Sequence, residues 1–306
     1  MSQHHHAPEG GRRLWMAVSV NVLLTVAQIL GGILSGSLSL IADALHNFSD
    51  AVSLIIALVA RKIARRPADD NMSFGYGRAE IVAALINYTT LIVIGLYLVY
   101  EAIMRFITPQ MIEGWLIVVI AGIALVVDLV TAALTYAMSK NSVNIRAAFL
   151  HNVADAMGSV AVIVAGSLIL LYDWMIVDPI VTLMIAGYIL WQSFREIGPV
   201  IRLLMLGVPI DKDPAEILKA LGETEGIKSA HHLHVWEIEE DRLSAEVHIV
   251  VKAADWSDAD KIKQAAKEKL ETMFGISHST LEIEREDSSS ALPSSGNRSR
   301  HKKPAS

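Results

Sequence analysis

Residues 38–64 read LSLIADALHNFSDAVSLIIALVARKIA, and this stretch decides the fold class. It is long and apolar enough to cross a bilayer as a helix, which takes ~20 predominantly apolar residues. It nevertheless carries His46 and Asp50 near its middle, where an ionisable side chain is costly and persists when a function or a partner requires it. We therefore predict a membrane-spanning helix that contains a functional site.

Five further apolar stretches accompany this one. The chain has 306 residues, of which 53% are hydrophobic, and its mean hydropathy is +0.42. This composition indicates a polytopic α-helical membrane protein with six transmembrane helices. The predicted spans are 14–34, 38–64, 79–106, 116–139, 147–172 and 175–194.

Basic residues lie mainly on one side of this topology. That side holds Arg12, Arg13, Arg61, Lys62, Arg65, Arg66, Arg78, Lys140, Arg146, Arg195 and Arg202. The other side holds only Arg105. By the positive-inside rule we expect an integral protein of the cell (inner) membrane with both termini in the cytoplasm. The first apolar stretch is too long for a signal-peptide core, so no cleavable signal peptide is expected.

From about residue 209 the pattern changes to that of a small cytoplasmic α+β domain. Periodicity predicts a helix, two strands, a helix and a strand, over 213–221, 232–238, 243–251, 258–274 and 279–284. The order αββαβ predicts helices on one face of a sheet. Residues 209–287 hold 19 acidic and 10 basic residues.

These patterns predict four segments. They are a flexible N-terminus over 1–12, a membrane domain over 13–208, a cytoplasmic metal-binding and dimerisation domain over 209–286 and a disordered tail over 287–306.

The second and fifth spans carry the same hexapeptide pattern, His46-Asn47-Phe48-Ser49-Asp50-Ala51 and His151-Asn152-Val153-Ala154-Asp155-Ala156. A His and an Asp four residues apart lie on one helix face. Both motifs fall near mid-membrane, so together they offer two nitrogens and two oxygens, enough for a tetrahedral metal shell. We predict one transport site formed by His46, Asp50, His151 and Asp155. The alternative is a pair of interhelical His–Asp hydrogen bonds that only hold the helices together.

The donor set of this site indicates the metal. The chain has no cysteine, so thiolate ligands are excluded. Two nitrogens and two oxygens suit Zn²⁺, and Co²⁺ nearly as well, whereas Mg²⁺ and Ca²⁺ prefer shells made only of oxygen. Zn²⁺ is the first choice, with Co²⁺, Ni²⁺ and Cd²⁺ as alternatives.

Three other acidic residues fall within or beside the spans. Asp43 is an accessory candidate that either shapes an exit path or pairs locally. Asp128 is either a support for the metal site or a structural partner. Asp178 precedes Pro179 near an interface, where helix capping is the simpler explanation.

Further motifs extend the pattern over most of the chain. They are Leu40-Ile41-Ala42-Asp43, Phe74-Gly75-Tyr76-Gly77-Arg78-Ala79-Glu80, Asp178-Pro179-Ile180 and His231-His232-Leu233-His234-Val235-Trp236. With the two HxxxD motifs, the chain resembles the cation diffusion facilitator family in its zinc-transporting branch, from about residue 13 to residue 284. The resemblance implies a homodimer, metal/proton antiport, export of metal from the cytoplasm and a metallochaperone-like cytoplasmic domain. In members that favour zinc the second-span motif begins with His, as it does at His46.

The chain departs from its relatives in two loops. Some relatives have a peripheral metal site after the second span, built with histidines. The matching positions here are Met72 and Tyr76, and only Asp70 remains, so we predict that this site is absent. The loop at 140–144 lacks the histidines that many relatives carry there. His4-His5-His6 near the N-terminus either scavenges metal or is an ordinary tail.

The resemblance also implies a metal site in the cytoplasmic domain. His231, His248 and Glu284 match positions that bind metal in family members, whereas a further ligand position is Lys261 here, which argues against a two-metal cluster. The alternates are His232, His234 and His278, of which His234 and His278 are accessory candidates. Bound cations would draw two acidic domains of a dimer together.

We therefore predict a divalent metal efflux transporter, a Zn²⁺/H⁺ antiporter that works by alternating access. Metal ligation needs deprotonated ligands, so protons compete for the same atoms. The expected partners are Zn²⁺, H⁺, membrane lipids and a second copy of the chain. No nucleic acid and no cofactor are expected, with Zn²⁺ as substrate and as a regulatory ligand.

Two other classes of protein are alternatives to a transporter. An intramembrane metallohydrolase needs an open coordination position and a general base, and the sequence contains no HExxH pattern. A membrane metal sensor is the other rival, but six spans around a mid-membrane site fit transport better. No Walker A pattern is present, which argues against direct use of ATP. The prediction is that the protein is not an enzyme.

Overall fold

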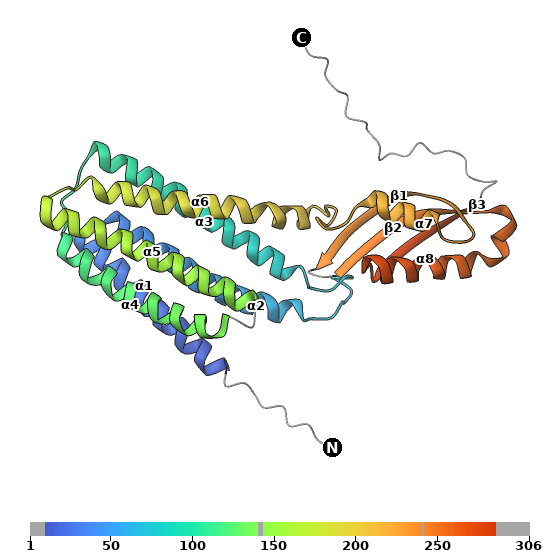
Figure 1. The fold of residues 1–306 in the computed structure, drawn as a ribbon, viewed down its shortest axis with the longest axis horizontal. Helices are drawn as coiled ribbons and strands as arrows, with labels where there is room; N and C mark the ends of the chain where they lie inside the picture. The colour runs from blue at the N-terminus through green and yellow to red at the C-terminus, as the bar shows by residue number, and fades with distance from the viewer. Residues whose placement is uncertain (1–9, 140–142, 240–241, 286–306) are drawn as a thin grey trace, which may run out of the picture. The chain divides into compact units, whose positions relative to one another are not determined.

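The computed structural model describes residues 10–139, 143–239 and 242–285 (Figure 1). The chain divides into two compact units, one made of Met1–Val59 and Ala83–Ile197, the other of Ala60–Val82 and Gly198–Ser306. The histidines at positions 4–6 and the tail predicted over 287–306 lie outside the described residues.

Six long helices precede the small sheet. They are α1 (Gly10–Ser35), α2 (Leu38–Ala64), α3 (Ala79–Ile107), α4 (Gly114–Ser139), α5 (Val143–Tyr172) and α6 (Val177–Leu204). Among the described residues, five helices are long and apolar enough to cross a membrane, and Val22–Ser35 of α1 is a shorter apolar helix. The predicted polytopic helical membrane protein is thus confirmed.

One helix continues well beyond its predicted span. Helix α6 continues to Leu204, past the predicted end at residue 194. The apolar run stops at Phe194, but Arg195 and Glu196 are good helix formers and the helix continues through them. The end of the apolar run therefore indicates where the apolar span ends, and the helix itself ends later.

Two apolar clusters hold the first unit together. One joins Leu40 of α2 to residues of α4 and α5, including Ile117 and Val162. The other joins Ala42 of α2 to Leu98 of α3 and to Ala186 of α6, among others. Helices α4 and α5 approach closely, since a Cβ atom added to Gly114 would lie 2.6 Å from the carbonyl oxygen of Gly166.

The second unit contains a three-stranded sheet in the order β1 (Ile227–Glu239), β2 (Arg242–Val251) and β3 (His278–Arg285). Strand β2 pairs antiparallel with β1 and parallel with β3. Helices α7 (Pro214–Gly222) and α8 (Ala259–Phe274) supply Ile217, Leu221, Ile262 and Leu270 to the core with the strands. The predicted αββαβ order is confirmed, with a short 3₁₀ helix at Ala253–Asp258 in addition.

Strand β1 differs from its prediction in length and regularity. It begins at Ile227, not at residue 232, because Ile227 pairs with Val251 at the far end of β2. Its register shifts between His231 and His234, and His232 has a positive φ of 54°. A bulge of this kind redirects the side chains around it, and here it lies within the histidine-rich motif.

Candidate metal centre

Helices α2 and α5 bring the four predicted transport ligands together. Asp50 Oδ2 lies 3.1 Å from His151 Nε2 and 3.8 Å from His46 Nε2. Asp155 completes a ring, with Oδ1 3.4 Å from His46 Nε2 and Oδ2 3.5 Å from His151 Nε2. Two nitrogens and two carboxylates thus alternate around one point.

These separations match the size of a tetrahedral ion shell. With metal–ligand bonds of about 2.0–2.2 Å, neighbouring ligand atoms of a Zn²⁺ shell lie about 3.3–3.6 Å apart. His46, Asp50 and Asp155 each offer a ligand atom within 4.8 Å of the others. Small side-chain adjustments would therefore bring all four groups around one cation.

Burial within the ring is uneven. The side chains of His46 and Asp155 are 11% and 12% exposed, whereas those of His151 and Asp50 are 39% and 28% exposed. His46 Nδ1 is buried without a hydrogen-bond partner among the described residues, and buried Asp155 Oδ1 has none there beyond its 3.4 Å approach to His46 Nε2. Because an unpaired buried polar atom is costly, these atoms favour a site that receives a ligand over a finished structural network.

A buried polar network ties α1 to the ligand-bearing helix. The Gln28 amide donates to Asp43 Oδ2 at 2.6 Å, and the Asn47 amide donates to Gln28 Oε1 at 3.2 Å. All three residues are buried. Of the two roles considered for Asp43, local pairing is therefore present, and this pairing fixes the helix face next to His46.

Two other acidic residues also have defined partners. Asp128 of α4 accepts a hydrogen bond from Ser159 of α5 at 3.0 Å, which joins the two helices. Asp178 does cap a helix, but the helix is α2 and not its own. Its carboxylate accepts from the backbone N–H groups of Leu38 at 2.8 Å and Ser39 at 3.0 Å.

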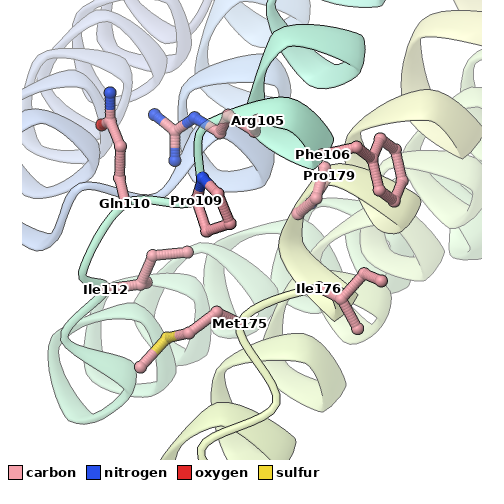
Figure 2. A pocket seen from close by; sticks show the side chains of 8 residues that line it. All are labelled: Arg105, Phe106, Pro109, Gln110, Ile112, Met175, Ile176 and Pro179. Atoms are coloured by element: carbon pink, nitrogen blue, oxygen red, sulfur yellow. The ribbon is translucent and has the colours of Figure 1, made fainter.

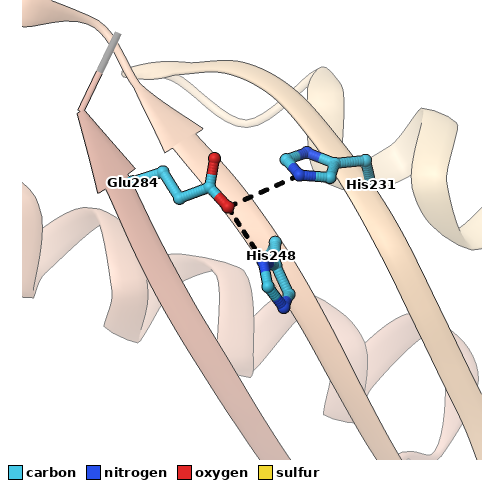
Figure 3. A group of neighbouring side chains, drawn as sticks. All are labelled: His231, His248 and Glu284. Carbon is cyan, nitrogen blue, oxygen red and sulfur yellow. Dashed lines mark hydrogen bonds and ion pairs between the residues drawn. The ribbon is translucent and has the colours of Figure 1, made fainter. Parts of the chain in front are cut away.

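A second cluster lies in the cytoplasmic-type domain, where His231, His248 and Glu284 meet across three strands (Figure 3). Glu284 Oε1 lies 2.8 Å from His248 Nδ1 and 3.5 Å from His231 Nε2. His231 is directly opposite His248 in the β1–β2 register. The three residues that the family resemblance suggested are therefore adjacent in space.

The residue found next to this cluster is not one of the alternate ligands that the sequence suggested. Glu282 was not singled out, yet its Oε2 lies 3.3 Å from His248 Nε2. The alternation of β3, which places residues 282 and 284 on one face, would have indicated it. His234 Nε2 lies 3.3 Å from His232 Nε2, and His278 lies against the ring of Phe74 instead.

The loop after α2 has its own hydrogen-bonded arrangement. Asp69 accepts from the Tyr76 hydroxyl at 2.9 Å and from the backbone N–H groups of Asn71 and Met72. The Tyr76 hydrogen bond, followed by the backbone ones, lowers the pKa of Asp69 below its usual value. Tyr76 thus donates a hydrogen bond to a carboxylate of the same loop.

A cavity of about 160 Å³ lies near the ends of α3 and α6 (Figure 2). Its lining is mainly apolar, and Arg105 and Gln110 are its polar members. The side chains of this lining include no imidazole and no carboxylate, which are the donors that the His/Asp ring offers to Zn²⁺ or Co²⁺.

A bundle of membrane-length helices with a His/Asp ring, followed by an α+β domain with a second His/Glu cluster, defines an integral membrane protein that handles metal cations. The chain matches the cation efflux transmembrane domain over residues 14–205 and the cytoplasmic domain of cation efflux proteins over residues 209–286. It belongs to the cation efflux family, known also as the cation diffusion facilitators.

Several characterised relatives align over nearly the whole chain. The cadmium, cobalt and zinc/H⁺-K⁺ antiporter of Bacillus subtilis is 36% identical over 288 residues, covering 92% of each chain. The metal cation efflux system protein CzcD of Cupriavidus metallidurans is 34% identical, covering 92% of this chain and 89% of its own. The zinc transporter ZitB of Escherichia coli is 32% identical, covering 91% and 90%.

Proposed function

We propose that the protein exports divalent metal cations, Zn²⁺ first among them, from the cytoplasm in exchange for protons. The ion binds at the His46, Asp50, His151 and Asp155 ring, and both termini face the cytoplasm. The observation that carries this proposal is the ring itself: two imidazole nitrogens and two carboxylates at shell-sized separations inside a membrane bundle.

The charge of the ring explains why an ion can be held there. Two ionised aspartates balance one divalent cation, so the loaded site is close to neutral in a medium where a net charge is costly. Protons occupy the same ligand atoms when the metal leaves. Exchange of one metal ion for protons at a single site needs no separate energy-converting domain.

Selectivity follows from the donors. Imidazole with carboxylate suits Zn²⁺ and Co²⁺ and disfavours Mg²⁺ and Ca²⁺. The relatives named for cadmium, cobalt and zinc support a range wider than Zn²⁺ alone. Membership in a family of cation efflux transporters argues against the hydrolase and sensor alternatives.

The cytoplasmic cluster has a regulatory role in this proposal. His231, His248 and Glu284 bind a cation in the cytoplasmic domain, and the match of this domain to a cytoplasmic dimerisation domain supports a homodimer. An added cation reduces the repulsion between two acidic domains.

The test is metal flux in proteoliposomes. Purified protein in vesicles with a metal-sensitive dye inside should carry Zn²⁺ and Co²⁺ but not Mg²⁺, and a pH dye should report proton movement in the opposite direction. Zn²⁺ uptake without a proton signal would refute the proposed exchange for protons. Absence of any metal flux would refute the proposed transport function.

A further inference from the structure

The imidazole of His46 lacks the hydrogen bond that usually orients a metal ligand. Its Nε2 lies 3.4 Å from Asp155 Oδ1 and 3.8 Å from Asp50 Oδ2. Its other nitrogen, Nδ1, is buried and has no hydrogen-bond partner among the described residues. A histidine that binds a metal almost always donates its second N–H to a carboxylate, a carbonyl or water, which fixes the orientation of the imidazole. The orientation of the His46 imidazole therefore depends on other contacts.

The orientation of this imidazole matters for ion binding. The torsion that turns a histidine side chain about the bond between Cβ and the imidazole is broad and roughly two-fold, so the side chain itself restrains it little. Turning about that bond moves Nε2 away from the carboxylates of Asp50 and Asp155. A contact that restrains the plane of the imidazole therefore affects how well His46 binds an ion.

Tyr188 of α6 makes such a contact. The centroids of the Tyr188 and His46 rings are 6.4 Å apart and the two planes meet at 83°. This is an edge-to-face arrangement, in which aromatic rings attract one another at centroid separations of about 4.5–7 Å. His151 also lies against His46, with centroids 6.1 Å apart, but it is itself one of the four ligands. Tyr188 therefore contributes an aromatic contact from outside the ion shell.

The packing of α6 beside α2 explains why Tyr188 lies at this depth. Both helices begin close to Asp178, because this residue of the first turn of α6 caps α2 at Leu38. The two helices also share an apolar cluster. At the rise of an α-helix, His46 lies about 12 Å beyond Leu38, and Tyr188 lies about 15 Å beyond Asp178 along its own helix. The difference is less than one turn, so the cap brings Tyr188 to nearly the same level as His46.

Tyr188 is supported along its own helix. Trp191 follows three residues later, so both side chains lie on one helix face. The centroids of these two rings are 6.3 Å apart at an interplanar angle of 35°. Arg195 Cζ lies in turn 5.8 Å from the centroid of the Trp191 ring. Because Tyr188 is 42% exposed, it is not part of the buried core, and its replacement tests the contact more than the packing.

We propose that Tyr188 is a positioning residue of the transport site, which holds the imidazole of His46 in the orientation that favours Zn²⁺. The inference rests on the function proposed above and adds a third helix, α6, to the metal site. A firmly held nitrogen keeps the four donors at separations that suit a small ion. A loosely held one lets the donors spread around a larger ion such as Cd²⁺. Tyr188 therefore contributes to selectivity as well as to affinity.

Substitutions at Tyr188 separate the aromatic ring from the hydroxyl. Tyr188→Leu removes the aromatic contact, whereas Tyr188→Phe keeps it and removes only the hydroxyl. Tyr100→Leu is the matched control, because Tyr100 is an exposed tyrosine of α3. For binding measurements all three are made in a His248→Ala background, so that the cytoplasmic cluster does not add a second site. Tyr188→Met replaces the leucine variant if size-exclusion chromatography shows that the latter does not fold.

The first measurement is Zn²⁺ affinity of the full-length protein in detergent, by competition with a zinc-chelating dye. Tyr188→Leu should weaken binding about three- to tenfold, which is the loss expected for one edge-to-face aromatic contact. Tyr188→Phe and Tyr100→Leu should bind as the parent protein does. A loss of less than about threefold in Tyr188→Leu, or an equal loss in Tyr188→Phe, would overturn the proposal.

The second measurement tests whether Tyr188 acts through His46. In vesicles, Tyr188→Leu should lower the ratio of Zn²⁺ flux to Cd²⁺ flux. In a His46→Asp background the imidazole is absent, so adding Tyr188→Leu should leave that ratio unchanged, since the two changes remove the same contact. An equal fall of the ratio in both backgrounds would show that Tyr188 acts elsewhere, and the proposal would be wrong.

Flux by the unmodified protein in the same vesicles distinguishes failure of this inference from failure of the proposed function. If the unmodified protein carries Zn²⁺ and Tyr188→Leu matches it in both affinity and flux ratio, only the role of Tyr188 is refuted. If the unmodified protein carries no metal, the proposed transport function and this inference are refuted together.

Discussion

Replacing Asp155 by Asn is the most direct test of the four-ligand ring. The two carboxylate oxygens of Asp155 lie 3.4 Å from His46 Nε2 and 3.5 Å from His151 Nε2. Asparagine keeps the size and one oxygen donor but removes the negative charge. The change therefore isolates charge balance from packing.

The expected loss can be worked from that charge. A divalent cation with two aspartates is neutral, and with only Asp50 ionised the loaded site keeps one positive charge. A charge at the centre of a membrane helix costs about 2.5–3.5 kcal/mol on insertion scales. Converted to affinity, this cost predicts Zn²⁺ binding weaker by roughly 60- to 300-fold, with a corresponding loss of flux at low metal concentration.

The assay is competition against a zinc-chelating dye with the full-length protein in detergent, followed by flux in vesicles. Asp70→Asn, in the exposed loop after α2, is the matched control and should bind as wild type does. Size-exclusion chromatography checks that both variants fold. An Asp155→Asn affinity within about threefold of wild type, or ~0.65 kcal/mol, would refute the assignment of Asp155 as a ligand.

Three further predictions address selectivity, the cytoplasmic cluster and the loop. His46→Asp replaces a nitrogen donor of the ring with an oxygen, so Cd²⁺ flux should rise relative to Zn²⁺ flux; an unchanged ratio would mean that His46 is not the filter. His248→Ala should lower the number of Zn²⁺ ions bound per chain in equilibrium dialysis, because His248 contacts Glu284, whereas His278→Ala should leave it unchanged; equal effects would contradict the cluster. Tyr76→Phe removes the first cause of the lowered pKa of Asp69, so the pKa of Asp69 should rise toward its ordinary value of about 3.9 in a carboxyl ¹³C NMR titration. A carboxyl group with a lowered pKa stabilises the folded state above its unfolded-state pKa, and this contribution is lost as the pH falls through its folded-state pKa. The stability of the loop should therefore fall less on acidification in the variant than in the wild type. An unshifted Asp69 titration would show that the hydrogen bond does not form.

The sequence predicted those features of the structure that depend on one physical cause acting along a single helix. Membrane helices need long apolar runs, so the helical membrane domain and the start of α2 at Leu38 could be predicted. The i, i+4 spacing placed His46 and Asp50 on one face, and the repeat pointed to the partner motif. The end of α6 at Leu204 was missed because a helix can outlast its apolar run.

What the sequence by itself determined is therefore the class of protein, the helices and the two pairs of candidate ligands. Each of these follows from hydropathy or from spacing along one element. Only the tertiary structure decided that Asp178 caps α2 from another helix, that Glu282 lies beside His248, and that the carboxylate of Asp155 lies 3.4 Å from His46 on another helix. These facts depend on contacts between residues far apart in the chain, which periodicity along a single helix or strand does not encode.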